Sequence, residues 1–156
     1  MKKRIGQDAL RAIPLGGHGE IGKTCWLFEY KDEIIIVNFG MMLSPQDLTG
    51  VDLILPCPSY LIENQHKIKA LIITSAPDDL AGGVSYLLGK VKIPKIYGSK
   101  LAIECIKRTM PEGVEFPEYE EIEARKEFKI GNEFEIKPIQ NTSVLPDTYG
   151  IYIRTS

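Results

Sequence analysis

The sequence has little histidine, little cysteine and no excess of charge of either sign. Two histidines stand among 156 residues, and 19 basic residues face 21 acidic ones, for a net charge of −2. This balance excludes an overall electrostatic attraction to nucleic acid or anionic lipid, so any such binding must be local. Cys25, Cys57 and Cys105 are odd in number and far apart, which excludes a disulfide framework and a Cys-x-x-Cys zinc half-site. We expect reduced thiols, mostly in the core.

Long apolar runs are also missing. No stretch approaches the roughly 18 to 20 apolar residues that cross a bilayer, and the opening MKKRIGQDAL lacks the apolar segment of a secretory signal. We therefore expect a cytoplasmic protein with no membrane partner. The length and the 44% of hydrophobic residues are ordinary for one globular domain. We place that domain at residues 10–156, after a short basic N-terminal tail at 1–9.

The order of the elements predicts an α/β fold with a mixed sheet. β-rich runs across the polar pair Lys31 and Asp32 predict a hairpin, and Gly131 with Asn132 predicts a second one. Residues 41–50 are typical of a loop. Strands are expected at 9–15, 24–30, 33–40, 69–75, 92–98, 127–130, 133–139 and 149–155, and helices at 58–64, 78–88 and 100–110, the last with Ser99 as N-cap.

The stretch GHGEIGKT satisfies the spacing of a phosphate-binding P-loop through Gly17, Gly22, Lys23 and Thr24. A P-loop needs a helix after the loop, because the helix N-terminus directs its N–H groups at the phosphates. Here TCWLFEYKDEIIIV follows, which favours strands, and Asn38 ends the run where a Walker B aspartate is expected. We therefore predict a glycine turn between two strands and no nucleotide site. Tight, Mg²⁺-dependent ATP binding lost on changing Lys23 would reverse this interpretation.

Several ordered blocks carry a resemblance to a known family. They are IPLGGHGEIGKTCWLFEYKDEIIIV, GVDLILPCPSYLIENQHKIKALIIT, DDLAGGVSYLL, IPKIYGSKLA and IQNTSVLPDTYGIYIRT. In order and spacing they resemble the N-terminal part of ribonuclease J, a metallo-β-lactamase-fold nuclease of the β-CASP group. The resemblance implies a partial αββα sandwich, with a mixed sheet carrying helices on one side. It also implies that the other face of that sheet is left open.

The family's two-zinc motif, Thr-His-x-His-x-Asp-His followed by x-Gly-Gly, aligns on TSAPDDLAGG. Ser75, Pro77 and Leu80 stand at the histidine positions, and Asp79 alone remains as a ligand. Ser143 aligns with a fourth histidine and Asn38 with an aspartate. Hydroxyl and leucine side chains are poor or useless zinc ligands, so we predict no metal, no cofactor and no catalytic residue. We expect Asp78 and Asp79 to cap a helix, and His18 and His66 to be surface residues.

These residues favour a catalytically inactive, metal-free assembly or regulatory module in RNA metabolism, and thus not an enzyme. Its open face would be covered by a second copy in a homodimer or by a ribonuclease J-type protein. The alternative is a metal-dependent RNA hydrolase whose site is completed by another chain. Cys57, between two prolines, is the most exposed thiol, and the run EYEEIEARKEFK is interpreted as a solvated face. RNA is a possible partner through a modest basic strip of Lys67, Lys69, Lys90, Lys92 and Lys95.

Overall fold

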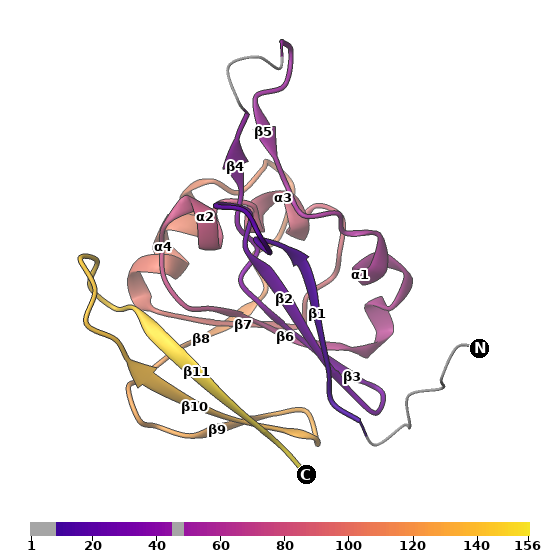
Figure 1. Ribbon diagram of the computed structural model, residues 1–156, viewed down its shortest axis with the longest axis vertical. Coiled ribbons are helices and arrows are strands. Elements are labelled where there is room, and N and C mark those ends of the chain that lie inside the picture. The colour runs from indigo at the N-terminus through magenta and orange to yellow at the C-terminus, as the bar shows by residue number, and fades with distance from the viewer. Residues whose placement is uncertain (1–8, 45–48) are drawn as a thin grey trace.

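A six-stranded sheet organises the molecule, in the order β1-β2-β3-β6-β7-β8 (Figure 1). The computed structural model describes residues 9–44 and 49–156, so the predicted tail at 1–9 lies almost wholly outside the described residues. The first three strands pair antiparallel, and β3, β6, β7 and β8 pair parallel, which confirms a mixed α/β sheet. The strands are β1 Arg11–Gly16, β2 Cys25–Tyr30, β3 Glu33–Val37, β6 Ile68–Ile73, β7 Lys95–Gly98 and β8 Glu118–Glu121.

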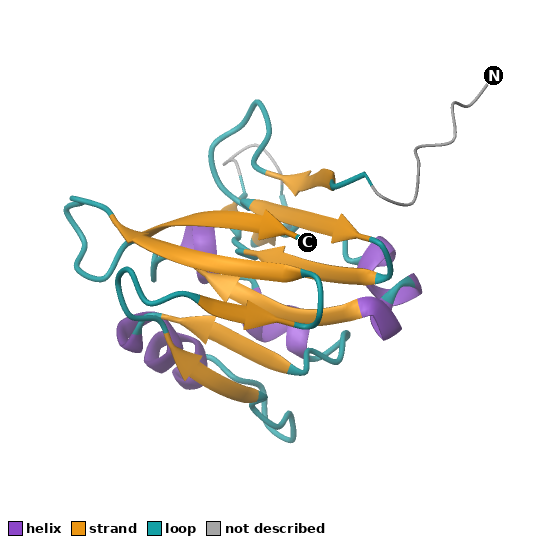
Figure 2. Cartoon of the chain, turned by 90° about the horizontal axis from the view of Figure 1, so that it is seen from below, coloured by secondary structure: helices purple, strands orange, loops and turns teal. Residues whose placement is uncertain are grey.

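Short helices cover one face of this sheet (Figure 2). They are α1 Ser59–Glu63, the 3₁₀ turn η1 Gln65–Lys67, α2 Asp78–Ala81, α3 Val84–Leu88 and α4 Lys100–Arg108. The predicted cap of α4 is confirmed, because Ser99 Oγ accepts a hydrogen bond from Ala102 N at 3.2 Å. The core between sheet and helices, here called the sheet–helix core, consists mainly of Cys25, Leu27, Ile34, Ile36, Phe39, Leu61, Leu71, Ile73, Val84, Leu87, Ile96, Ile103 and Ile106.

The single helix predicted over 78–88 is wrong, because α2 ends at Ala81 and α3 begins at Val84. Gly83 N donates to Phe39 O at 2.9 Å, and a Cβ on Gly83 would lie only 2.7 Å from Gly40 O. The close approach of this backbone to the segment after β3 therefore requires a glycine and interrupts the helix.

A second, three-stranded sheet covers the other face of the large sheet and lies nearest the viewer in Figure 2. It consists of β9 Phe128–Ile130, β10 Phe134–Gln140 and β11 Tyr149–Thr155, in the order β11-β10-β9. The hairpin at Gly131 and Asn132 is confirmed. The core between the two sheets, here called the inter-sheet core, contains Tyr30, Ile35, Val37, Ala70, Ile72, Tyr97, Ile122, Ile130, Phe134, Ile136 and Tyr149.

This arrangement corrects the expectation that one face of the large sheet is open. The C-terminal strands β9, β10 and β11 fold back across this face and cover it over β3, β6 and β7. Glu33 on β3 holds the turn between β9 and β10 against the large sheet, since its carboxylate accepts hydrogen bonds from Asn132 N at 3.0 Å and Glu133 N at 3.1 Å. The chain therefore forms a sandwich of two sheets with helices on one outer face.

Two further elements differ from the sequence prediction. The charged run beginning at Glu118 contains β8, whose four residues are all exposed. This strand pairs with β7, and Lys95 of β7 forms ion pairs with Glu118 and Glu120 at 3.0 and 2.9 Å. The expected loop at 41–50 contains β4 Met42–Leu43, which pairs with β5 Leu53–Ile54 in a small ribbon. Residues 45–48 of that loop lie outside the described residues. In the described part of the chain, no helix has the length and apolar character needed to cross a membrane.

Candidate functional site

Asn38 and Ser75, two of the residues that the sequence singles out, lie with two further polar residues where three strands begin or end. Asn38 directly follows β3, Thr74 and Ser75 follow β6, and Thr148 directly precedes β11. Because β3 and β6 are parallel neighbours, their carboxyl ends meet at one edge of the large sheet, which is where α/β proteins place their sites. The start of β11 brings the second sheet to the same edge. We call these four residues the strand-end cluster.

Asn38 holds the ends of β3 and β6 together. It is only 5% exposed and adopts φ +63°, a left-handed conformation that asparagine tolerates better than most residues. Its side-chain oxygen accepts hydrogen bonds from Thr74 N at 2.9 Å and Thr74 Oγ1 at 3.0 Å, and its own N–H donates to Ile72 O at 2.8 Å. Both lone pairs of the amide oxygen are therefore occupied.

Ser75 and Thr148 join the two sheets. Their hydroxyl oxygens lie 3.0 Å apart, and Ser75 is only 2% exposed. Tyr149 N donates to Thr74 O at 2.9 Å beside this contact. The sequence points to Asn38 and Ser75 but not to Thr148, since no local pattern links Ser75 with a residue 73 positions away.

The rest of the aligned motif lies outside this cluster. Asp78 and Asp79 are exposed in the first turn of α2, as expected, but the prediction that they cap the helix is wrong, because the N-cap is Pro77 and no side-chain cap bond forms. Their backbone carbonyls instead accept from Met41 N at 2.7 Å and Thr24 N at 3.0 Å. Leu80 O likewise accepts from Phe39 N at 3.0 Å. This segment therefore ties loops together through its main chain.

Ser143 is exposed in the loop at 141–148, and its hydroxyl accepts a hydrogen bond from Leu145 N of the same loop, at 3.5 Å. Across residues 9–44 and 49–156, no three histidine, cysteine, aspartate or glutamate side chains group to hold a metal. Amide and hydroxyl oxygens that bind each other are weak ligands for zinc, and leucine and proline provide none. The strand-end cluster therefore does not fit the pair of zinc ions that the resemblance implies.

The glycine-rich loop connects β1 to β2, as predicted. Gly17 and Gly22 adopt positive φ, and the loop runs directly into β2 instead of into a helix. Lys23 Nζ pairs with Glu20 at 3.0 Å, and Lys23 N donates to Met41 O at 3.1 Å. The lysine that a P-loop would direct at a phosphate is therefore paired within its own loop.

The thiols and imidazoles are spread over the molecule. Cys25 is fully buried in the sheet–helix core, and this burial raises the pKa of its thiol. Cys57 is exposed, and a hydrogen bond with the Ser59 hydroxyl lowers the pKa of its thiol. The expected core position of Cys105 is wrong, because α4 leaves it exposed. His18 and His66 are both exposed, as expected for surface residues.

The basic strip proposed for RNA is largely neutralised. Lys67 reaches the buried carboxylate of Glu29 at 3.3 Å and Asp32 at 3.5 Å, and Lys69 lies 3.8 Å from Glu33. Lys95 pairs with two glutamates of β8, which raise the pKa of its ammonium group. Among the described residues, only Lys90 and Lys92 of the five form no ion pair, so the strip gives a weak field for RNA.

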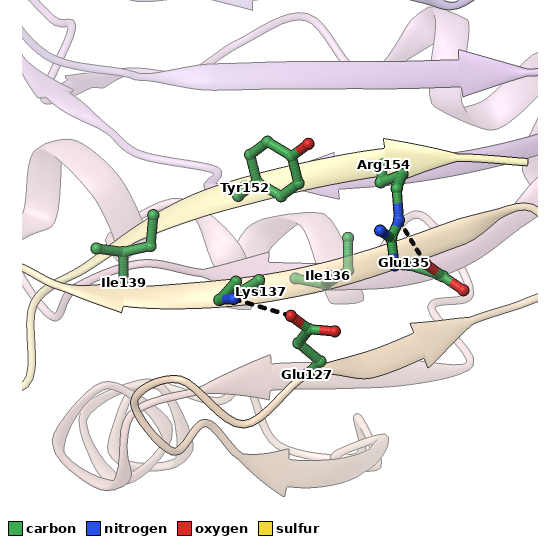
Figure 3. A pocket seen from close by; sticks show the side chains of 7 residues that line it. All are labelled: Glu127, Glu135, Ile136, Lys137, Ile139, Tyr152 and Arg154. Atoms are coloured by element: carbon green, nitrogen blue, oxygen red, sulfur yellow. Dashed lines mark hydrogen bonds and ion pairs between the residues drawn. The ribbon is translucent and has the colours of Figure 1, made fainter.

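A shallow depression of about 360 Å³ lies on the outer face of the three-stranded sheet (Figure 3). Its charges are paired across strands: Arg154 Nε donates to Glu135 at 2.6 Å, and Lys137 lies 3.0 Å from Glu127. Ile139 and Tyr152, which line it as well, are about half exposed. The arrangement contains neither a nucleophile with a base nor an excess positive charge, so we assign it no chemistry.

One side of the sandwich is incompletely covered. In the described residues β11 pairs only with β10, and β1 only with β2, so both are edge strands. Near them Trp26, Phe28, Ile151 and Ile153 are only partly buried at the margin of the inter-sheet core, and we call these four residues the open rim. Trp26 and Phe28 stack with ring centroids 6.5 Å apart. Tyr30 Oη donates to Ser156 O at 2.8 Å, which places the end of β11 beside β2.

No family model matches the chain. Curated relatives do match: ribonuclease J of Synechocystis is 36% identical over 99% of this chain, and ribonuclease J of Thermus thermophilus 36% over 96%. Ribonuclease J 2 of Staphylococcus aureus is 32% identical over 94%. The chain spans only about a quarter of these relatives' length, 24%, 27% and 26% respectively.

Solved structures show the fold. The metallo-β-lactamase fold protein YhfI from Bacillus subtilis superposes with a TM-score of 0.64 at 15% identity, over 94% of this chain and 58% of that chain. A protein of unknown function from Enterococcus faecalis superposes with a TM-score of 0.65 at 16% identity, over 94% of this chain and 41% of that one. The expected partial metallo-β-lactamase fold is therefore confirmed.

The relatives also correct one prediction. The expectation that the chain is not an enzyme is contradicted, because the relatives are named ribonuclease J, an enzyme family. That expectation judged a whole protein from a few side chains in a region that spans a quarter of its relatives. Over nearly its whole length, this chain is similar to ribonuclease J, and it has the metallo-β-lactamase fold.

Proposed function

We propose that this chain works in ribonuclease J-type RNA processing, as one half of a metallo-β-lactamase sandwich that a second half completes. The single observation that carries the proposal is the 36% identity with Synechocystis ribonuclease J over 99% of this chain. Because the chain spans 24% of that relative, RNA hydrolysis is assigned to the completed assembly. The second half belongs either to the same protein or to a partner chain.

The open rim supports a position for the second half. β11 exposes one row of backbone N–H and C=O groups, which an added strand can pair with. Beside it Ala12 and Pro14 lie opposite Phe28 and Trp26 in the antiparallel register, so the four share one face of the large sheet. Ala12 and Pro14 are exposed and the two aromatic rings are half-buried. A segment that extends the small sheet beyond β11 would cover this face.

The ligands for hydrolysis are assigned to residues outside the strand-end cluster. A metal-dependent ribonuclease activates water with ions held by imidazole or carboxylate groups. The amide and hydroxyls of the cluster are engaged with each other at 2.9 to 3.0 Å. The second half must therefore provide the reactive centre, whereas this chain provides the sheet on which that half rests.

A two-chain reconstitution tests the proposal. The chain is mixed with the part of Synechocystis ribonuclease J that it does not match, and the mixture is assayed for association by sedimentation and for cleavage of labelled single-stranded RNA with Mn²⁺ or Zn²⁺. We expect a one-to-one complex, and cleavage that requires both chains. Absence of association and of any effect on RNA cleavage would contradict the proposal.

Two variants locate the contact. Trp26→Glu places a charge in the open rim and should abolish association, because burying an unpaired carboxylate has a large free-energy cost. Tyr152→Ser is the matched control, since Tyr152 lies on the outer face of β11 and is 54% exposed. Equal loss of association in both variants would exclude the open rim as the docking surface.

A further inference from the structure

We infer that the strand-end cluster is a joint between the two sheets that forms and holds without metal, at the edge where the resemblance places a metal centre. This goes beyond the proposed function, because it concerns how this chain's own residues maintain the site. It rests on the mismatch between the donor groups present here and the ions that the family's motif binds.

The cluster links three strand ends through side chains. Asn38 connects the end of β3 to Thr74 after β6, and Ser75 connects the end of β6 to Thr148 before β11. The backbone bond from Tyr149 N to Thr74 O adds a second connection between β6 and β11. In a metal centre, one ion would perform this linking by drawing ligands from several strands together.

The hydroxyl groups of Ser75 and Thr148 donate their hydrogen bonds in one direction along the cluster. Thr148 Oγ1 lies 3.3 Å from Leu145 O, which can only accept, so the Thr148 proton points there. Ser75 must then donate to Thr148 Oγ1 across the 3.0 Å contact. The chain of donors therefore runs from β6 through Thr148 into the loop at 141–148, and it orders this loop against the large sheet.

The cluster leaves no donor atom waiting for an ion. In the described residues, every buried side-chain nitrogen or oxygen has a hydrogen-bond partner. All four members are neutral, so the cluster has no charge that a cation would compensate. Opening it for a metal would break bonds to the buried Asn38 and Ser75, and a buried polar group without a partner is costly. The joint is therefore expected to exclude cations.

Thermal unfolding with zinc tests this directly. The chain is melted with EDTA, with one equivalent of ZnCl₂ and with one equivalent of MnCl₂, and calorimetric titration measures binding. We expect midpoints within about 1 °C of each other and no stoichiometric binding, because a metal that binds only the native state would raise the midpoint. A rise of several degrees with one equivalent of either metal would overturn the inference.

Two variants test the joint itself. Ser75→Ala and Thr148→Val should each lower the midpoint by about 2 to 4 °C, as the loss of one hydrogen bond predicts for a chain of this size. The double variant should lose no more than Thr148→Val alone, since that variant already removes the contact with Ser75 together with the bond to Leu145 O.

Hydrogen exchange at the Tyr149 amide, which should quicken about fivefold in these variants, gives a local readout. Thr142→Val, exposed in the same loop, is the matched control and should change neither quantity. Additive losses, or an effect of Thr148→Val no greater than that of Thr142→Val, would refute the joint. These tests use the chain alone with metal ions, so their failure is distinct from failure of the RNA assay.

Discussion

The two cores of the molecule are closed to different degrees. In the sheet–helix core the central side chains of Leu27, Ile36 and Leu71 are fully buried. In the inter-sheet core Ile35 and Ile72 are equally buried, but Tyr30, Val37 and Tyr149 remain 7 to 9% exposed, and four further apolar residues form the open rim. The helices therefore cover their face of the six-stranded sheet, whereas a three-stranded sheet is too narrow to cover the opposite face.

The largest expected effect is in the closed core. Leu71→Ala should lower the free energy of unfolding by about 3 to 5 kcal/mol, because a rigid, fully buried site cannot collapse around the missing atoms. Urea denaturation followed by circular dichroism measures the change. A loss below about 1 kcal/mol would mean that the sheet–helix core is looser than its burial indicates.

The clamp between the sheets should rank second. Glu33→Ala leaves Asn132 N and Glu133 N without their acceptor and should cost about 2 to 3 kcal/mol, since the bonds to this 5% exposed carboxylate are charge-assisted. The same denaturation experiment applies. Asp32→Ala, next in sequence but with an exposed side chain, is the control and should stay within about 0.5 kcal/mol. A similar loss in both variants would argue against the clamp.

A smaller effect is expected at the open rim. Ile153→Ala should cost about 1 kcal/mol in the isolated chain, because the side chain is only partly buried. If a second half docks there, the same variant should cost more in the complex, and the ratio of the two losses measures how far docking closes the rim. Equal losses in the chain and in the complex would place the docking surface elsewhere.

The smallest perturbation is chemical labelling of the thiols. Cys57 should react with iodoacetamide at lower pH than an ordinary thiol, since the hydrogen bond with Ser59 lowers its pKa and favours the reactive thiolate. Cys25 should react only as the sheet–helix core opens, because burial raises its pKa and blocks access. Mass spectrometry of labelled peptides against pH follows both. Labelling of Cys25 under native conditions as fast as that of Cys57 would show that this core is open.

Much of the fold could be predicted from local pattern. The β-branched runs of β3 and β6, the polar pair between β2 and β3, and the Ser99 cap act through neighbouring residues, and the structure confirms each. The strand β8 could not be predicted in this way. Its residues are all exposed, and it exists only because β7 offers an edge and Lys95 offers a counter-charge.

The candidate site, too, could be predicted from the sequence only in part. The alignment with the family located Ser75 and Asn38, which stand where a histidine and an aspartate are expected. The partner of Ser75 lies 73 residues away and is set by how the second sheet folds back. The aspartates of the motif were assigned to capping because they begin a helix, but the short α2 is held instead through its backbone carbonyls.

Most strands, the turns and the chemical character of each donor group follow from the sequence alone, because these depend on residue type and near neighbours. Only the tertiary structure decided that the second sheet covers the first, that the open rim lies beside β11, and that neutral groups from three strand ends meet. Such meetings depend on the packing of whole layers, where burial of apolar surface outweighs any local preference.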